Sequence, residues 1–328
     1  MTKHPITVHV ATVGVSLFEN LLTEASSKVE EVLGDTDLSR AVFNERERIH
    51  DLKGELKNPR EEVLRVSEKL IKETSDEGQA REALEDLVEE ISPDLWPRDV
   101  SAELASLAAN RGGNPRLDIG GEIDETVLLI ASDTGRGLRA ALFNALVITS
   151  GDVDRVDYLP TPNSTFRVEH GRVTIVRLPG LDAENNEQFL RAMRELSAFG
   201  PFFEEALRNP ESTCRFHLTG GFRVAMPFLL GFAQALHSLY DGQISTHAQY
   251  EFSSSPRSIE LPLSAPRTDD LEGKLAGSDD DGYFENEPPE GNIWEGFAYE
   301  FVPDQLRWRL TPFGMALREL IPKTKNAP

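Results

Sequence analysis

Cysteine, positive charge and long apolar runs are all scarce in this 328-residue chain. The single cysteine, Cys214, excludes an intrachain disulfide and a zinc site built from cysteines. No apolar run approaches the roughly 20 residues that a membrane-spanning helix needs. The first residues also lack the pattern of a secretory signal peptide. We therefore expect a cytoplasmic protein with no membrane partner.

Acidic residues outnumber basic ones by 56 to 34, which gives a formal net charge of -22. Non-specific binding of duplex DNA or RNA depends on lysine and arginine contacts to phosphates, so this composition argues against a duplex DNA partner. Any nucleic-acid ligand must be small and be met by a local basic spot. A hydrophobic share of 39% and a charged share of 27% are ordinary for a globular protein.

Metal-ligand and fused-nuclease motifs are also missing. The seven histidines show no ligand spacing, so we expect neither a metal nor another cofactor. His9 and His217 fall inside predicted strands, where a packed core histidine is the expected role. Arg46 and His50 are too close for a HEPN-ribonuclease motif, and the Glu-x-Lys at 55–57 falls in a helical region.

What the chain does have is an alternation of apolar, β-branched runs with amphipathic helical segments. This alternation predicts an α/β fold with a Rossmann-like, mostly parallel sheet and helices on both faces. Segments 247–252 and 258–263 are expected to form a hairpin at the edge of the sheet. The other predicted strands are 6–13, 125–131, 153–159, 172–178 and a strand ending at Leu218, with helices at 138–148, 185–208 and 222–240.

Composition divides the chain into three parts. The Rossmann-like domain spans 1–266 and includes a helical insertion at about 36–112, after the first strand–helix unit. Segment 267–292 is acidic and rich in Gly and Pro, and is predicted to be a mobile linker. Segment 293–328 is predicted to be a small C-terminal α+β tail, whose aromatic residues form a small core of their own: Trp294, Trp308 and Phe313.

Three predicted strands end in a polar, glycine-containing turn that leads into a helix. In a parallel sheet such turns lie on one edge, where α/β proteins bind their ligands. Adjacent glycines allow close backbone approach, and helix starts offer free N–H groups to anions, so phosphate is the first ligand suggested. The junction residues are Gly14, Val15, Ser16, Ser132, Asp133, Thr134, Thr219, Gly220, Gly221, Phe222 and Arg223.

Plainer interpretations remain open at these junctions. Ser16 can be a simple helix cap, and Arg223 can be a solvated side chain beside an ordinary strand-to-helix turn. An ordinary dinucleotide-binding enzyme is disfavoured, because no G-x-G-x-x-G follows the first strand.

The same junctions resemble the motifs of the CRISPR-associated Rossmann-fold (CARF) family. VATVGVSLFENLL is similar to the family's opening TVGTSL motif, LLIASDTGRGLRAA to its strand followed by SDT and glycine, and RFHLTGGFRVAMPFLLGFAQAL to its TGGFK motif. RDVSAELASL and AQYEFSSSPRSIELPL are similar to segments of the branch of standalone ring nucleases. The matches occur in the family's order and cover about 6–266.

The resemblance implies a homodimer that binds a cyclic oligoadenylate across its two-fold axis. It implies a ring nuclease of type III CRISPR antiviral defence that cuts cyclic tetra-adenylate without metal, by attack of a ribose 2′-OH. The alternative is a non-catalytic CARF sensor or regulator that signals through its C-terminal tail.

Residue by residue, Ser16 matches the family's motif serine and Arg223 its motif lysine, which implies catalytic roles for both. The other junction residues are implied ligand contacts. Val15 replaces a usual threonine. Arg223 keeps the positive charge of the lysine and can bind a phosphate through two hydrogen bonds, but it cannot change its protonation state.

Overall fold

The computed structural model describes most of the chain outside the predicted helical insertion. The described residues are 4–14, 101–117, 124–132, 135–159, 161–162, 169–181, 186–221, 223–240, 242–249, 258–263, 275, 278–279, 281–284, 295 and 298–320. The predictions for the insertion before residue 101 and for Trp294 lie outside these residues.

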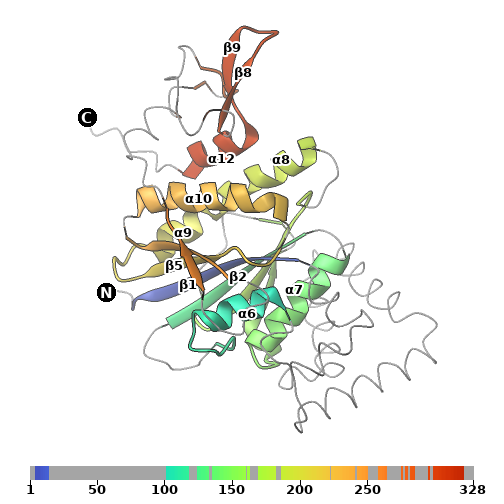
Figure 1. Ribbon diagram of the computed structural model, residues 1–328, viewed down its shortest axis with the longest axis vertical. Helices are drawn as coiled ribbons and strands as arrows, with labels where there is room; N and C mark the ends of the chain where they lie inside the picture. The colour runs from blue at the N-terminus through green and yellow to red at the C-terminus, as the bar shows by residue number, and fades with distance from the viewer. Residues whose placement is uncertain are drawn as a thin grey trace, which may run out of the picture.

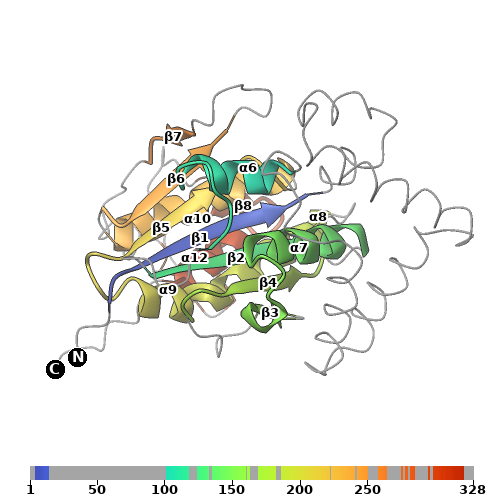
Figure 2. The same ribbon diagram turned by 90° about the horizontal axis from the view of Figure 1, so that it is seen from below.

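A seven-stranded sheet with the order β3-β4-β2-β1-β5-β6-β7 forms the centre of the molecule (Figure 2). Its strands are β1 (Ile6–Val13), β2 (Asp124–Ser132), β3 (Val156–Leu159), β4 (Val173–Leu178), β5 (Thr213–His217), β6 (Ile244–Ala248) and β7 (Ile259–Leu261). Every pair is parallel except β6 with β7. The predicted Rossmann-like sheet and its edge hairpin are therefore confirmed, although β6 begins and ends earlier than predicted.

Helices cover both faces of this sheet (Figure 1). On one face lie α6 (Ala102–Ala109) and α7 (Gly135–Ile148), and on the other lie α8 (Asn186–Glu195), α9 (Gly200–Ala206) and α10 (Met226–Leu239). Alternate residues of β1 join the two apolar layers, which explains why the whole strand is buried. Among the described helices, none combines the length and the apolar character needed to cross a bilayer.

Three local elements differ from the predicted pattern. The helix expected at 185–208 is divided into α8, the 3-10 helix η4 (Leu196–Phe199) and α9. Pro201 lies in the first turn of α9, where its missing N–H costs nothing; inside one continuous helix it would break a hydrogen bond. Residues Val153–Arg155 form the 3-10 helix η3 before β3, and the 3-10 helix η5 (Arg223–Ala225) precedes α10.

The predicted C-terminal strand pair and helix are present as β8 (Tyr299–Val302), β9 (Arg307–Leu310) and α12 (Pro312–Leu320). Figure 1 shows the β8–β9 hairpin beyond α12, away from the sheet. The rings of Phe313 and Phe228 meet edge to face, with centroids 5.3 Å apart. The prediction of a separate tail core is wrong, because the buried tail residues belong to the same apolar cluster as α8, α9 and α10.

Part of the predicted linker packs into the core of the protein. Leu275 and Phe284 are buried, and the backbone N–H of Phe284 donates to the carbonyl of Trp308 at 3.0 Å. Leu275 and Phe284 are thus part of the folded core, whereas Asp279 and Asp281 are exposed. The ring of Phe284 meets that of Tyr299 of β8 edge to face, with centroids 5.9 Å apart, so burial holds these apolar side chains within an acidic stretch.

Candidate functional site

The central three strands bring the three predicted junctions to one edge of the sheet. β2, β1 and β5 are neighbours and run in the same direction, so Ser132, Gly14 and Thr219 all lie at or just after the carboxyl ends of their strands. The chain crosses from one half of the sheet to the other between β4 and β5, so the gap between β1 and β5 is the topological switch point. The predicted common edge is confirmed for these described residues.

Several predicted site residues cannot be placed on this edge. Arg223 is described by its backbone only, as the first residue of η5. The helix predicted from 222–223 begins as the 3-10 helix η5 at Arg223, and its α-helical part, α10, begins only at Met226, with Pro227 in its first turn. The residues outside the described part of the chain are Val15, Ser16, Asp133, Thr134 and Phe222.

The ends of β1 and β5 touch through their backbones. A Cβ added at Gly14 would lie 3.0 Å from the Cα of Gly221, and one added at Gly221 would lie 2.1 Å from Thr12 Oγ1. The Thr12 hydroxyl donates to the carbonyl of Gly220 at 3.1 Å. Gly221 also has a φ of +90°, which favours glycine. The two loops are therefore joined tightly at the switch point.

Glu103, in the first turn of α6, lies against both loops. Its Oε1 accepts a hydrogen bond from the backbone N–H of Gly14 at 2.8 Å, and a Cβ added at Gly220 would lie 2.3 Å from the same oxygen. The residue is 1% exposed, and its Oε2 has no hydrogen-bond partner among the described residues. The sequence did not reveal this role, because Glu103 appears there only as part of the Ser-Ala-Glu segment that resembles the family.

Burial raises the pKa of Glu103, although the nearby amide of Gly14 and the hydroxyl of Ser101 oppose the shift. A carboxyl that takes up a proton more readily than an exposed one therefore lies beside two loops suited to an anion. In its neutral form it does not repel a phosphate, whereas its ionised form does.

These contacts change the interpretation of the glycine pair. The sequence predicts that Gly220 and Gly221 leave room for a ligand. In the structure, the space beside them is filled by Glu103 and Thr12. Internal packing alone accounts for both glycines, and their contact with a ligand stays a prediction.

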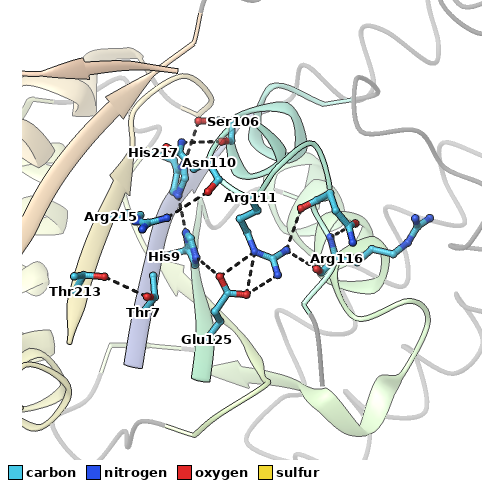
Figure 3. Close-up of polar contacts among 11 residues, drawn as sticks. Thr7, His9, Ser106, Asn110, Arg111, Arg116, Glu125, Thr213, Arg215 and His217 are labelled. Carbon is cyan, nitrogen blue, oxygen red and sulfur yellow. Dashed lines mark hydrogen bonds and ion pairs between the residues drawn. The ribbon is translucent and has the colours of Figure 1, made fainter. Parts of the chain in front are cut away.

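A line of buried polar side chains lies between the sheet and α6 (Figure 3). His9 Nδ1 is 3.0 Å from His217 Nε2, and His217 Nδ1 is 3.1 Å from Ser106 Oγ on α6. The two histidines are 0% and 1% exposed, so the prediction that they are buried is confirmed. They are not surrounded by apolar atoms alone, however, because each ring nitrogen of His217 faces a polar partner.

The line ends in an ion pair near the start of β2. His9 Nε2 is 3.3 Å from Glu125 Oε1, and Arg111 Nε donates to Glu125 Oε2 at 3.0 Å. Burial alone would raise the pKa of Glu125, but hydrogen bonds from His9 and Arg111 and the charge of Arg111 lower it to about 2. Burial lowers the pKa of both His9 and His217. Glu125 is therefore ionised and the imidazoles are neutral at pH 7.

At its other end the line reaches the predicted ligand loop. Thr219 Oγ1 donates to Ser106 Oγ at 3.3 Å and accepts from the backbone N–H of Gln249 at 2.7 Å. Ser132, the remaining described junction residue, is buried as the last residue of β2. Of the predicted site, the structure thus shows direct contacts between the residues that follow β1 and those that follow β5.

No group of three or more His, Cys, Asp or Glu side chains among the described residues is arranged to hold a metal ion. Cys214 lies buried in β5, and burial raises the pKa of its thiol, which keeps it protonated and unreactive.

A scan against protein-family models matched no family, and a search of curated proteins found no matching relative. The resemblance to CARF proteins therefore rests on the quoted motifs and stays a prediction.

Proposed function

We propose that the protein is a CARF-type ring nuclease, which binds a cyclic oligoadenylate between two copies of the chain and cuts it. The observation that supports this proposal best is the parallel pairing of β1 with both β2 and β5. It gathers the three polar junctions that carry the resemblance onto one edge, at the switch point where α/β sheets bind nucleotides. Cyclic tetra-adenylate is the ring that the resemblance favours.

The proposed reaction needs only positioning and charge stabilisation. The ribose 2′-oxygen forms a bond to the adjacent phosphorus, the bond from phosphorus to the 5′-oxygen breaks, and the proton of the 2′-OH ends on the leaving oxygen. The product carries a 2′,3′-cyclic phosphate. In-line positioning can remove several kcal/mol of the barrier. Arg223 and backbone N–H groups would stabilise the developing charge, at about 3 kcal/mol per donor. Ser16 would hold the phosphate or ribose.

The test is to incubate the purified protein with labelled cyclic tetra-adenylate and cyclic hexa-adenylate in EDTA and to follow linear products. We expect cleavage of the tetra-adenylate and strong loss of cleavage in Arg223→Ala and Ser16→Ala. Arg191→Ala is the matched control, because Arg191 is an exposed arginine of α8 whose ion pair with Glu187 lies within the same helix. Cleavage unchanged in Arg223→Ala would remove the role proposed for this arginine.

The C-terminal tail gives specific support to a second candidate, a sensor without nuclease activity. α10 begins directly after the ligand loop and η5, and Phe228 in its first turn packs against Phe313 of α12. A movement of this loop when a ligand binds would therefore be transmitted to the tail through α10. Tight binding of an intact ring that persists through long incubation would favour this sensor over the nuclease.

A further inference from the structure

In the buried polar line, the donor and the acceptor of each hydrogen bond can be deduced by starting from the end at Glu125. It runs from Arg111 and Glu125 through His9, His217 and Ser106 to Thr219 (Figure 3 shows all of these except Thr219). Each member contributes a limited number of hydrogens. Fixing the position of one hydrogen therefore fixes the next.

The starting point is the carboxylate of Glu125. Arg111 donates to both of its oxygens, and an ionised carboxylate can only accept hydrogen bonds. His9 must therefore carry its hydrogen on Nε2, which faces Glu125 Oε1 at 3.3 Å. A neutral imidazole has one N–H, so His9 Nδ1 is an acceptor.

The same reasoning continues across the sheet. Because His9 Nδ1 accepts, His217 must donate from Nε2, which lies 3.0 Å away. His217 Nδ1 is then an acceptor and takes the only hydrogen of the Ser106 hydroxyl, at 3.1 Å. Ser106 Oγ is left to accept, in agreement with the donation from Thr219 Oγ1 at 3.3 Å.

Thr219 is therefore left without a hydrogen for a ligand. Its hydroxyl hydrogen is used by Ser106, and one lone pair is used by the N–H of Gln249. A threonine hydroxyl has one donor and two acceptor sites, so a single lone pair remains. Thr219 is partly exposed and lies two residues after β5, at the carboxyl edge of the sheet where the proposed ligand would bind.

We propose that Thr219 acts only as an acceptor and contacts an O–H or N–H group of the ligand, and that it does not contact a phosphate oxygen. This inference rests on the proposed function, because it assumes that the ligand reaches this loop. In a cyclic oligoadenylate the candidate donors are the ribose 2′-hydroxyl and the adenine amino group. Phosphate contacts then fall to the backbone N–H groups and to Arg223. Thr219 is a specificity-determining residue in this view, and the histidine line is what orients it.

The direction of the line can be tested without any ligand. Long-range proton–nitrogen NMR spectra of the ¹⁵N-labelled protein at pH 7 report which imidazole nitrogen carries the hydrogen. We expect both His9 and His217 to be neutral, with the hydrogen on Nε2. Assignment by the single variants His9→Gln and His217→Gln identifies the two signals. A hydrogen on Nδ1 of either ring, or a charged imidazolium, would overturn the deduced direction whether or not the protein binds a ring.

The ligand contact is tested by combining protein variants with ligand variants. Thr219→Val removes the lone pair, whereas Thr219→Ser keeps the hydroxyl and serves as the matched control. We expect Thr219→Val to weaken binding of cyclic tetra-adenylate about tenfold and Thr219→Ser to change it by less than about threefold. Rings with 2′-deoxyribose or with dimethylated adenine amino groups identify the donor.

For the ring that lacks the contacted donor, we expect Thr219→Val and the wild type to bind with the same affinity. An equal loss for all rings, including a ring that lacks both donors, would contradict the proposal. A wild-type protein that binds no ring would refute the proposed function and the ligand contact together, while the NMR result would still decide the direction of the line.

Discussion

Glu103 is a buried carboxyl group that lies against both loops of the candidate site. It is almost completely buried, it holds the backbone of Gly14, and one of its oxygens has no partner among the described residues. An unpaired buried carboxylate oxygen is costly when the group is ionised, which is the physical reason for its raised pKa. Its charge state therefore links the stability of the two loops to pH.

This link predicts the effect of Glu103→Gln on the pH dependence of stability. Because the folded protein holds the proton more tightly than the unfolded chain, the contribution of Glu103 is greatest below pH 4.5. It is lost as the pH rises through the raised pKa of the folded state. Glu103→Gln keeps an acceptor for Gly14 but cannot ionise. We expect urea unfolding to show that this variant gains stability relative to the wild type between pH 5 and pH 8.

Glu211→Gln is the control, because it removes an exposed carboxylate far along the chain. Its stability relative to the wild type should change much less over the same pH range. A Glu103→Gln curve parallel to that of the wild type would show that Glu103 does not ionise in this range.

The contact between Gly221 and Thr12 predicts a large cost for Gly221→Ala. The added Cβ meets Thr12 Oγ1 at 2.1 Å, and the φ of +90° is unfavourable for alanine. We expect Gly221→Ala to lose about 2–5 kcal/mol of unfolding free energy. Gly242→Ala shares a positive φ of +73° but has open space around it, so it should lose only about 1–2 kcal/mol. Equal losses would show that the crowding is relieved by small shifts.

Among the described helices, α6 contributes side chains to both loops and to the polar line. Its first turn supplies Glu103 to the two loops, its middle supplies Ser106 to the polar line, and the carbonyl of its C-terminal cap Asn110 accepts from Arg215 at 3.3 Å. Ser101 caps the helix by accepting from the N–H of Leu104 at 3.1 Å. A single short helix thus connects the exits of β1 and β5 to the face of the sheet beneath it.

The contact between α10 and α12 predicts that the tail and the sheet domain unfold together. Phe313 is fully buried between the tail and the sheet domain. We expect Phe313→Ala to lower the unfolding free energy by about 3–5 kcal/mol while unfolding remains a single transition. Phe301→Ala, at a ring that is 44% exposed on β8, should cost less than about 1 kcal/mol. Two separate transitions in Phe313→Ala would mean that the tail unfolds on its own.

For the molecule as a whole, the net charge of -22 predicts a response to salt. Like charges on a compact surface repel one another, and at physiological ionic strength salt screens the repulsion between exposed charges that lie more than roughly 8 Å apart. We expect the thermal midpoint to rise by a few degrees when NaCl is raised from about 20 to about 150 mM, with an equal rise in KCl. A falling midpoint would show that favourable ion pairs, such as Arg111 with Glu125, outweigh the net repulsion.

The α/β fold, the parallel sheet and the common edge of the three junctions could all be predicted from the chain's own pattern. Apolar runs long enough to be buried on both faces, separated by helical segments, leave few other arrangements. The same local reasoning missed the break at Pro201 and the packing of Phe284, because both depend on which neighbour each segment meets in space. Composition alone suggested a tail with a core of its own, and in the described residues the tail shares the core of the sheet domain.

The candidate site divides in the same way. Residue type and spacing along the chain were sufficient to find Gly14, Thr219 and the glycine pair, since each belongs to a turn that its immediate neighbours define. Glu103 and the histidine line could not be found in that way. Glu103 meets Gly14 across 89 positions and His9 meets His217 across 208. Such contacts exist only once the sheet and α6 are packed, because burial sets the proton affinities and distance sets the hydrogen bonds.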